Sequence, residues 1–195
     1  MRVVAINGSP RPRGNTNFMI SRVSAKLSEH GIECEIIEVG REAIRGCQGC
    51  DACYRLKNRT CRFNDDIVNS SIKSMAEADG IILGSPVYFS GVAGQMKSFL
   101  DRVFYVADAN GGLFRHKVGA ALVVAHRSGG SAALDGLNHY LSYSEMTIAT
   151  SNYWSIAHGT GPRDVMTDHE GIRIIETLTD NIAFLLHCRD MALMT

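Results

Sequence analysis

The feature that most constrains the fold is a regular alternation of short apolar runs with longer segments of helical periodicity. The apolar runs are rich in valine, isoleucine and alanine, which is typical of buried β-strands. They predict strands at Val3 to Ile6, Ile36 to Val39, Ile81 to Leu83, Val118 to Ala125 and Met146 to Ala149. Helical spacing is seen in Met96, Phe99, Leu100, Val103 and Phe104, and again in Ile172, Ile175, Leu178, Ile182, Leu185 and Leu186. Five strands that alternate with helices predict an α/β fold, in which helices cover both faces of a parallel sheet.

The sequence also indicates where some elements lie. The run VGAALVVA at 118–125 is apolar almost throughout, as expected of a strand buried on both faces in the middle of the sheet. The segment ECEIIEV at 33–39 interleaves glutamates with apolar residues, which favours an edge strand. Thr167 and Glu170 have the spacing of a capping box and predict the start of the last helix. A length of 195 residues is sufficient for one domain, 1–195.

Charge and hydropathy exclude several classes of partner. Twenty basic residues balance twenty acidic ones, so no overall field attracts nucleic acid or an anionic membrane. No apolar run approaches the length of a transmembrane helix, and the first residues lack the pattern of a secretory signal. We therefore expect a cytoplasmic protein whose cysteines stay reduced, which favours metal or redox roles for clustered cysteines over structural disulfides.

Four irregular segments, 7–15, 84–92, 126–130 and 151–167, each follow a predicted strand directly. Ligands of open α/β sheets bind beyond the carboxyl ends of the strands, so these four segments can share one site. A fifth irregular segment, 40–64, contains a cluster of cysteines.

The first segment has the composition of an anion site. NGSPRPRGNTN at 7–17 leads into a helix that begins near Asn15 or Thr16, and the N-terminus of a helix offers free N–H groups and a positive dipole. Ser9, Asn15 and Thr16 can add hydrogen bonds, and Arg11 or Arg13 can add charge. Because the segment lacks both G-x-G-x-x-G and a terminal Gly-Lys-Ser/Thr, a monophosphate is favoured. The alternative is an ordinary turn whose polar residues only cap the helix.

Two further segments offer ring-binding and polar surface. In GSPVYFSGVAGQMKSFLDR at 84–102, Pro86 stiffens the chain, Tyr88 and Phe89 provide flat apolar surface, and Gly91 allows close approach. Both aromatic rings could instead belong to the core, although two adjacent ones cannot easily both point inward. AHRSGG at 125–130 is either a third ligand-binding segment or a plain turn.

GSPRPRGNT, SPVYFSGVAGQMKSFLDR and AHRSGG together resemble the three FMN-binding loops of the flavodoxin-like NADPH-dependent FMN reductases. With the cysteine cluster, the whole chain resembles the iron–sulfur flavoproteins of anaerobic bacteria and archaea. The resemblance implies a doubly wound flavodoxin-like sheet with strand order 2-1-3-4-5. It implies FMN phosphate contacts from Ser9, Arg11, Asn15 and Thr16, contacts to the isoalloxazine ring from Pro86, Val87, Tyr88, Phe89 and Gly91, and less specific contacts from His126, Arg127 and Gly130. Arg13 is a further candidate cofactor-binding residue because of its charge in the same loop.

The cysteines Cys47, Cys50, Cys53 and Cys61 follow the pattern C-x2-C-x2-C-x7-C. Three close thiolates and one delayed thiolate suit a [4Fe–4S] cluster. A structural zinc site would use two separated C-x2-C pairs, and a thioredoxin-like pair would open a helix directly after a strand. Metal-free thiols remain an open alternative. Cys34 and Cys188 are expected to be core residues.

The resulting functional hypothesis is an oxidoreductase in which bound FMN is reduced by NAD(P)H, as a transient co-substrate, or by reduced ferredoxin, and then passes electrons to a small-molecule or protein acceptor. No catalytic acid, base or nucleophile is expected. The alternative is a non-enzymatic electron carrier or a redox sensor. The family resemblance implies a homodimer or homotetramer, and SNYWSIAHGTG at 151–161 is expected to form a flap, a subunit contact or part of the core.

Overall fold

The computed structural model, which describes residues 1–194, is built on one central sheet. Its strands are β1 (Arg2–Asn7), β2 (Glu33–Glu38), β3 (Gly80–Tyr88), β4 (Gly91–Val92), β5 (Val118–Ala125), β6 (Thr147–Ile148) and β7 (Ile156–His158). The parallel strands follow the order β2-β1-β3-β5-β6. β4 is a short antiparallel strand that pairs only with β3 and lies outside this order. When only the parallel strands are numbered along the chain, β5 and β6 are the fourth and fifth, so the predicted order 2-1-3-4-5 is confirmed.

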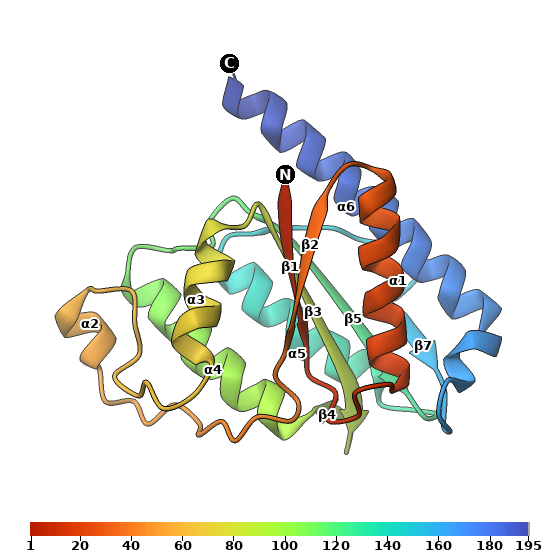
Figure 1. Ribbon diagram of the computed structural model, residues 1–195, viewed down its shortest axis with the longest axis horizontal. Coiled ribbons are helices and arrows are strands. Elements are labelled where there is room, and N and C mark those ends of the chain that lie inside the picture. The colour runs from red at the N-terminus through yellow and green to blue at the C-terminus, as the bar shows by residue number, and fades with distance from the viewer. Residues whose placement is uncertain (195) are drawn as a thin grey trace.

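Helices cover both faces of the sheet (Figure 1). They are α1 (Asn15–Glu29), α2 (Ala52–Leu56), α3 (Val68–Glu77), α4 (Gly94–Ala109), α5 (Gly130–Tyr143) and α6 (His169–Met194), with a short 3-10 turn η1 at Asp164–Thr167. α1 and α6 pack on one face, and α3, α4 and α5 on the other. None of the helices within residues 1–194 has both the length and the apolar character that crossing a membrane requires.

The alternation of side chains along β1 explains why the core has two halves. Val4 and Ile6 belong to the cluster under α3, α4 and α5, whereas Val3 and Ala5 belong to the cluster under α1 and α6. Because successive residues of a strand point to opposite faces, an entirely apolar strand serves both layers. All eight residues of β5 are buried, which confirms its predicted central position. β2 pairs with β1 and its residues are only half-buried or exposed, as predicted for an edge strand.

Two short strands, β6 and β7, occupy the place beside β5 where one strand was predicted. β6 lies along the start of β5, where Val118 pairs with Thr147, and β7 lies along its end, where Val123 pairs with Ile156. The prediction placed a single strand at Met146 to Ala149 and treated 151–167 as irregular, so it missed β7. Three residues are too few to show a strand period, and only pairing with β5 defines this one.

Other boundaries also needed correction. The last helix is capped by Asp168, whose carboxylate accepts a 2.9 Å bond from the Gly171 N–H, and not by the predicted capping box at Thr167. Thr167 instead closes the preceding turn by donating to the Asp164 carbonyl. The cysteine segment 40–64 contains the short helix α2, and Cys188 is exposed although it was expected in the core. Cys34 is half-buried against the α1/α6 side of the core, where burial raises the pKa of its thiol.

Candidate functional site

The first loop is a tight turn that delivers the N-terminus of α1 to the sheet edge. The Gly14 N–H donates to the Arg11 carbonyl at 3.0 Å, and the Phe18 N–H donates to the Gly14 carbonyl at 3.0 Å to begin the helix. The buried Ser9 hydroxyl accepts a bond from the Arg11 N–H at 3.2 Å, which tightens the turn. The N–H groups of the first helical turn have no intrahelical partner, so the loop presents donors and positive dipole character.

The fully buried Asn7 fixes this loop to the neighbouring chain. Its side-chain oxygen accepts the Ser9 N–H at 3.0 Å, and its amide donates to Glu38 at 2.9 Å. Its carbonyl accepts the N–H groups of Val39 and Gly40. A Cβ on Gly40 would lie 2.2 Å from the carbonyl carbon of Ser9, so only glycine permits this close approach of two backbones.

Four loops enclose one cavity of about 280 Å³ at the carboxyl ends of the strands. Its walls come from the first loop, the end of β3, the end of β5 and the turn after β7. The lining residues are Ser9, Arg11, Gly14, Asn15, Thr16, Pro86, Val87, Tyr88, Val124, His126, Gly159 and Thr160. The Asn15 amide donates to the Gly161 carbonyl at 3.0 Å, and the Thr160 hydroxyl lies 2.7 Å from Nδ1 of His126, so hydrogen bonds join three of the four loops.

Most of the predicted cofactor-binding residues meet in this cavity. Those it brings together are Ser9, Arg11, Asn15, Thr16, Pro86, Val87, Tyr88 and His126. Arg13, Phe89 and Gly91 lie outside its walls, and Arg127 and Gly130 line an adjacent cavity of about 390 Å³ beside Trp154. Gly159 and Thr160 were not predicted individually, although their segment, 151–167, was expected to contribute to the shared site. The glycine-rich HGTG after an apolar pair was the available signal.

The hairpin between β3 and β4 separates the two neighbouring aromatic residues. The segment 84–92 was predicted to be irregular, but β3 continues to Tyr88. The chain then reverses at Phe89 and Ser90, whose φ angles are positive, 49° and 59°. This turn leaves Phe89 fully exposed at the tip, whereas Tyr88 is 42% exposed and lines the cavity. The expectation that at least one ring is exposed is confirmed, and Tyr88 provides the flat surface inside the cavity.

The segment 151–155 lies between β6 and β7 in the chain. Tyr153 and Trp154 are 59% and 60% exposed, and their ring centroids lie 4.8 Å apart. Of the three expectations for this segment, a core position for Trp154 is wrong.

The four clustered cysteines line a second, much smaller cavity of about 20 Å³. Cys53 is buried in α2, Cys50 and Cys61 are half-buried, and Cys47 is exposed. Burial raises the pKa of the Cys53 thiol. Tyr105, on the cavity wall, donates a 2.6 Å bond to Asp51, and this bond raises the pKa of the phenol to about 12.

The donors of this cavity are four thiols, the ligand type of an iron–sulfur cluster. Among residues 1–194, no three His, Cys, Asp or Glu side chains are arranged to hold one metal ion. A cubane binds its thiolates at separate corners, so they stand farther apart than the ligands of one ion, and four cysteines are the ligand set it requires. The four thiols match such a cluster in ligand type and number. The sequence spacing alone could not show that Cys61 lines the same cavity as the other three.

Arg102 is the residue of this site that sequence reasoning missed. It lies on the buried face of α4 with 1% of its side chain exposed, and its Nε donates to Sγ of Cys61 at 3.3 Å. Its guanidinium also pairs with the buried carboxylate of Asp66. The signal was an arginine three residues after Phe99 within an apolar helical stripe.

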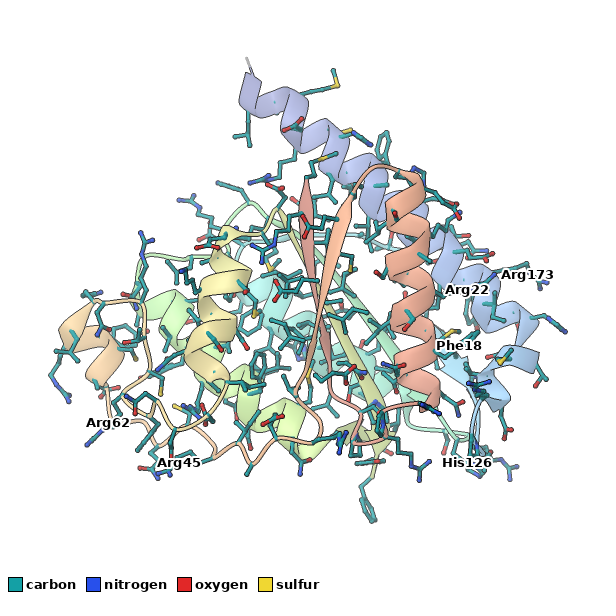
Figure 2. The ribbon with its side chains drawn as sticks, in the orientation of Figure 1. Phe18, Arg22, Arg45, Arg62, His126 and Arg173 are labelled. Carbon is teal, nitrogen blue, oxygen red and sulfur yellow. The ribbon has the colours of Figure 1, made fainter. Side chains whose placement is uncertain are left out.

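The two cavities lie apart along the same edge of the molecule. Figure 2 shows Arg45 and Arg62, which flank the cysteines, at one end of this edge and His126, from the larger cavity, at the other. The chain from Gly40 to Cys47 joins the two regions, since Gly40 packs on the first loop.

Comparison with protein families gives a match over residues 1–161 to the model described as NADPH-dependent FMN reductase. An iron–sulfur flavoprotein of Methanocaldococcus jannaschii is 35% identical over 190 residues, covering 94% of this chain and 96% of that protein. One from Archaeoglobus fulgidus is 32% identical over 192 residues, with the same coverage of 94% and 96%.

Solved structures match the fold at low sequence identity. RosB with bound 8-demethyl-8-formylriboflavin-5'-phosphate has a TM-score of 0.77 at 17% identity, covering 98% of this chain and 81% of that one. A WrbA-like flavodoxin from Agrobacterium tumefaciens has a TM-score of 0.67 at 14% identity, covering 96% and 98%. These matches identify the fold as flavodoxin-like.

Proposed function

Because the chain belongs to the NADPH-dependent FMN reductase family, in its iron–sulfur flavoprotein branch, we propose that it binds FMN in the cavity formed by the four loops. The bound flavin would accept electrons from NAD(P)H or reduced ferredoxin and pass them to a small-molecule or protein acceptor. The family supports flavin-dependent oxidoreduction, and the identities of donor and acceptor are part of the proposal.

One observation carries the assignment of the flavin site. The start of α1, the Arg11 side chain and the surface of Pro86, Val87 and Tyr88 all face the same cavity. A helix N-terminus and a guanidinium suit a phosphate, and an apolar wall with an aromatic ring suits a tricyclic ring system. We assign the phosphate to the first loop and the ring to the end of β3.

The remaining walls have supporting roles. The bond between Asn15 and Gly161 engages the Asn15 amide, so Asn15 serves the phosphate through its backbone N–H and holds the turn after β7 in place. His126 and Thr160 form a hydrogen-bonded pair that lines another side of the cavity. FMN, when bound, supplies hydride acceptance and single-electron release, so the protein needs only to bind and orient it.

We also propose that Cys47, Cys50, Cys53 and Cys61 hold a [4Fe–4S] cluster. The support is that all four thiols line one cavity and that two relatives, each covering 94% of this chain, are named iron–sulfur flavoproteins. A cluster supplies one-electron transfer, which complements a flavin that accepts two electrons together.

The test combines binding and turnover. Protein purified without oxygen should show flavin absorption together with a broad shoulder from the cluster, and the apoprotein should bind added FMN. Steady-state oxidation of NADPH and NADH, with a quinone or free flavin as acceptor, should then proceed for many equivalents. A colourless protein that does not respond to FMN would refute the flavin site, and reduction that stops after one equivalent would indicate an electron carrier or sensor.

A further inference from the structure

The guanidinium of Arg102 is buried beneath the cysteine segment, at the centre of α4. Phe99 and Val106, one turn to either side of it, are also buried. A buried guanidinium is costly unless its N–H groups are bonded and its charge is paired, and a buried ion pair rarely stabilises a fold more than apolar residues of the same volume would. Stability therefore does not explain why an arginine is buried at this position, and its role is inferred from the contacts that its side chain makes.

Those contacts hold both ends of the cysteine segment. On one side of the cysteines, Arg102 donates to the carbonyl of Arg45 at 3.4 Å. On the other side it donates to Sγ of Cys61 at 3.3 Å, to the carbonyl of Phe63 at 2.9 Å and to the Asp66 carboxylate. One side chain of α4 thus ties together residues on both sides of the cavity.

We propose that Arg102 is the positioning residue of the fourth cysteine ligand and makes the bound cluster easier to reduce. The inference rests on the proposed cluster. Cys47, Cys50 and Cys53 are three residues apart, but seven residues separate Cys53 from Cys61. Binding the cluster therefore costs the most conformational entropy at Cys61. The bond from Nε and the packing of Phe63 and Asp66 around the guanidinium reduce that cost.

The effect on reduction follows from charge. A cluster gains one negative charge when it accepts an electron, and hydrogen bonds to its sulfurs are among the factors that set its potential. An N–H donor that carries a positive charge, buried where water screens little, favours the more negative state. Asp66 offsets part of the charge of Arg102, but a carboxylate cannot replace the donor to sulfur.

The test uses the full chain, purified without oxygen, with its FMN and cluster. Arg102→Met removes both donor and charge, and Arg102→Lys keeps the charge but not the planar donor. Arg62→Met is the matched control, because Arg62 lines the same cavity but is exposed to solvent. The measurements are iron, sulfide and FMN per chain, the midpoint potential of the cluster, and the EPR signal of a three-iron species.

We expect Arg102→Met to make one-electron reduction of the cluster at least tenfold less favourable, a shift of about 59 mV to lower potential. We expect a fraction of the protein to lose the iron bound by Cys61 and show a three-iron signal. Arg102→Lys should shift the potential less but lose the same iron. Arg62→Met should keep its iron and shift the potential by less than half as much.

Iron content and potential equal to those of the wild type, or equal to those of Arg62→Met, would overturn the role of Arg102. If Arg102→Met does not fold, as judged by its FMN content, the iron content of Arg102→Lys tests the proposal: loss of iron supports it and a wild-type iron content overturns it. A wild-type protein with FMN but no iron would refute the proposed cluster itself, and that result is distinct from unchanged Arg102 variants in a protein that contains the cluster.

Discussion

The Asn15 amide donates a 3.0 Å hydrogen bond to the carbonyl of Gly161, 146 residues further along the chain. The bond joins the first turn of α1 to the turn that follows β7. Gly159 packs against the same side chain, because a Cβ at this position would lie 2.6 Å from the Asn15 amide nitrogen. The closure of the larger cavity therefore depends on a contact between two distant loops.

Replacement of Asn15 should loosen that closure. In Asn15→Ala, we expect the affinity for FMN to fall about fivefold, since a typical hydrogen bond contributes about 1 kcal/mol. Asn17→Ala is the control, because the Asn17 side chain bonds to Glu38 on β2 instead of to the turn after β7 and does not line the cavity. Titration of each apoprotein with FMN, followed by flavin fluorescence, measures the effect. Equal affinities for the two variants would argue against a role for the loop contact.

The two arginines of the first loop should differ. Arg11 lines the cavity and Arg13 does not, so Arg11→Met should weaken FMN binding about tenfold and Arg13→Met by less than about threefold. Riboflavin, which lacks the phosphate, should bind both variants as it binds the wild type. Increasing salt should reduce the difference, since Arg11 is exposed. If riboflavin binding falls in parallel with FMN binding, Arg11 does not contact the phosphate.

Gly40 should not tolerate a side chain. A Cβ there would lie 2.2 Å from the carbonyl carbon of Ser9, so Gly40→Ala should lower the free energy of unfolding by about 1–3 kcal/mol and weaken FMN binding. Gly136→Ala is the matched control within α5, where a Cβ has no neighbour within 4 Å. This control should be stabilised by about 0.5–1 kcal/mol. Urea unfolding of both variants checks the prediction, which fails if they shift in the same direction.

Tyr140 should make stability depend on alkaline pH. Burial, and then its hydrogen bond to Asp101, raise the pKa of Tyr140 from 10.0 to about 12. Between these values the folded protein binds more protons than the unfolded chain, so its stabilisation is complete below about pH 10 and is lost as pH rises through about 12. Tyr140→Phe should show a shallower loss of stability over this range. Tyr143→Phe, at an exposed site, should behave as the wild type in the same urea titrations.

The cysteines should separate into two classes. Cys50→Ser should lower the iron content below the four per chain of an intact cluster, because three thiolates no longer complete the ligand set. Cys188→Ser should retain its iron, since this exposed residue lies on α6, outside the cysteine cavity. FMN binding should survive in both variants because the two cavities are separate. Iron and sulfide analysis with a flavin assay measures all three quantities, and equal loss of iron in both variants would contradict the assignment.

Much of the scaffold followed from local patterns. The run at 118–125 predicted a central strand, and the glutamates at 33–38 predicted an edge, because burial on two faces or on one leaves a direct mark on composition. The elements that were predicted wrongly have no such local pattern in the sequence. β7 has three residues, Asp168 caps a helix without the expected capping box, and the left-handed turn at Phe89 and Ser90 carries none of the usual glycine or asparagine.

The sequence by itself determined the order of the longer strands and helices, the loop that presents the start of α1 and the clustering of four cysteines, since each depends on residues close together in the chain. Only the tertiary structure decided that Gly159 and Thr160 complete the larger cavity, that Arg13 and Phe89 lie outside it, and that Arg102 reaches Cys61. The physical reason is that periodicity records which face of a segment is buried. The partner that a buried side chain meets depends on how distant segments close around the sheet.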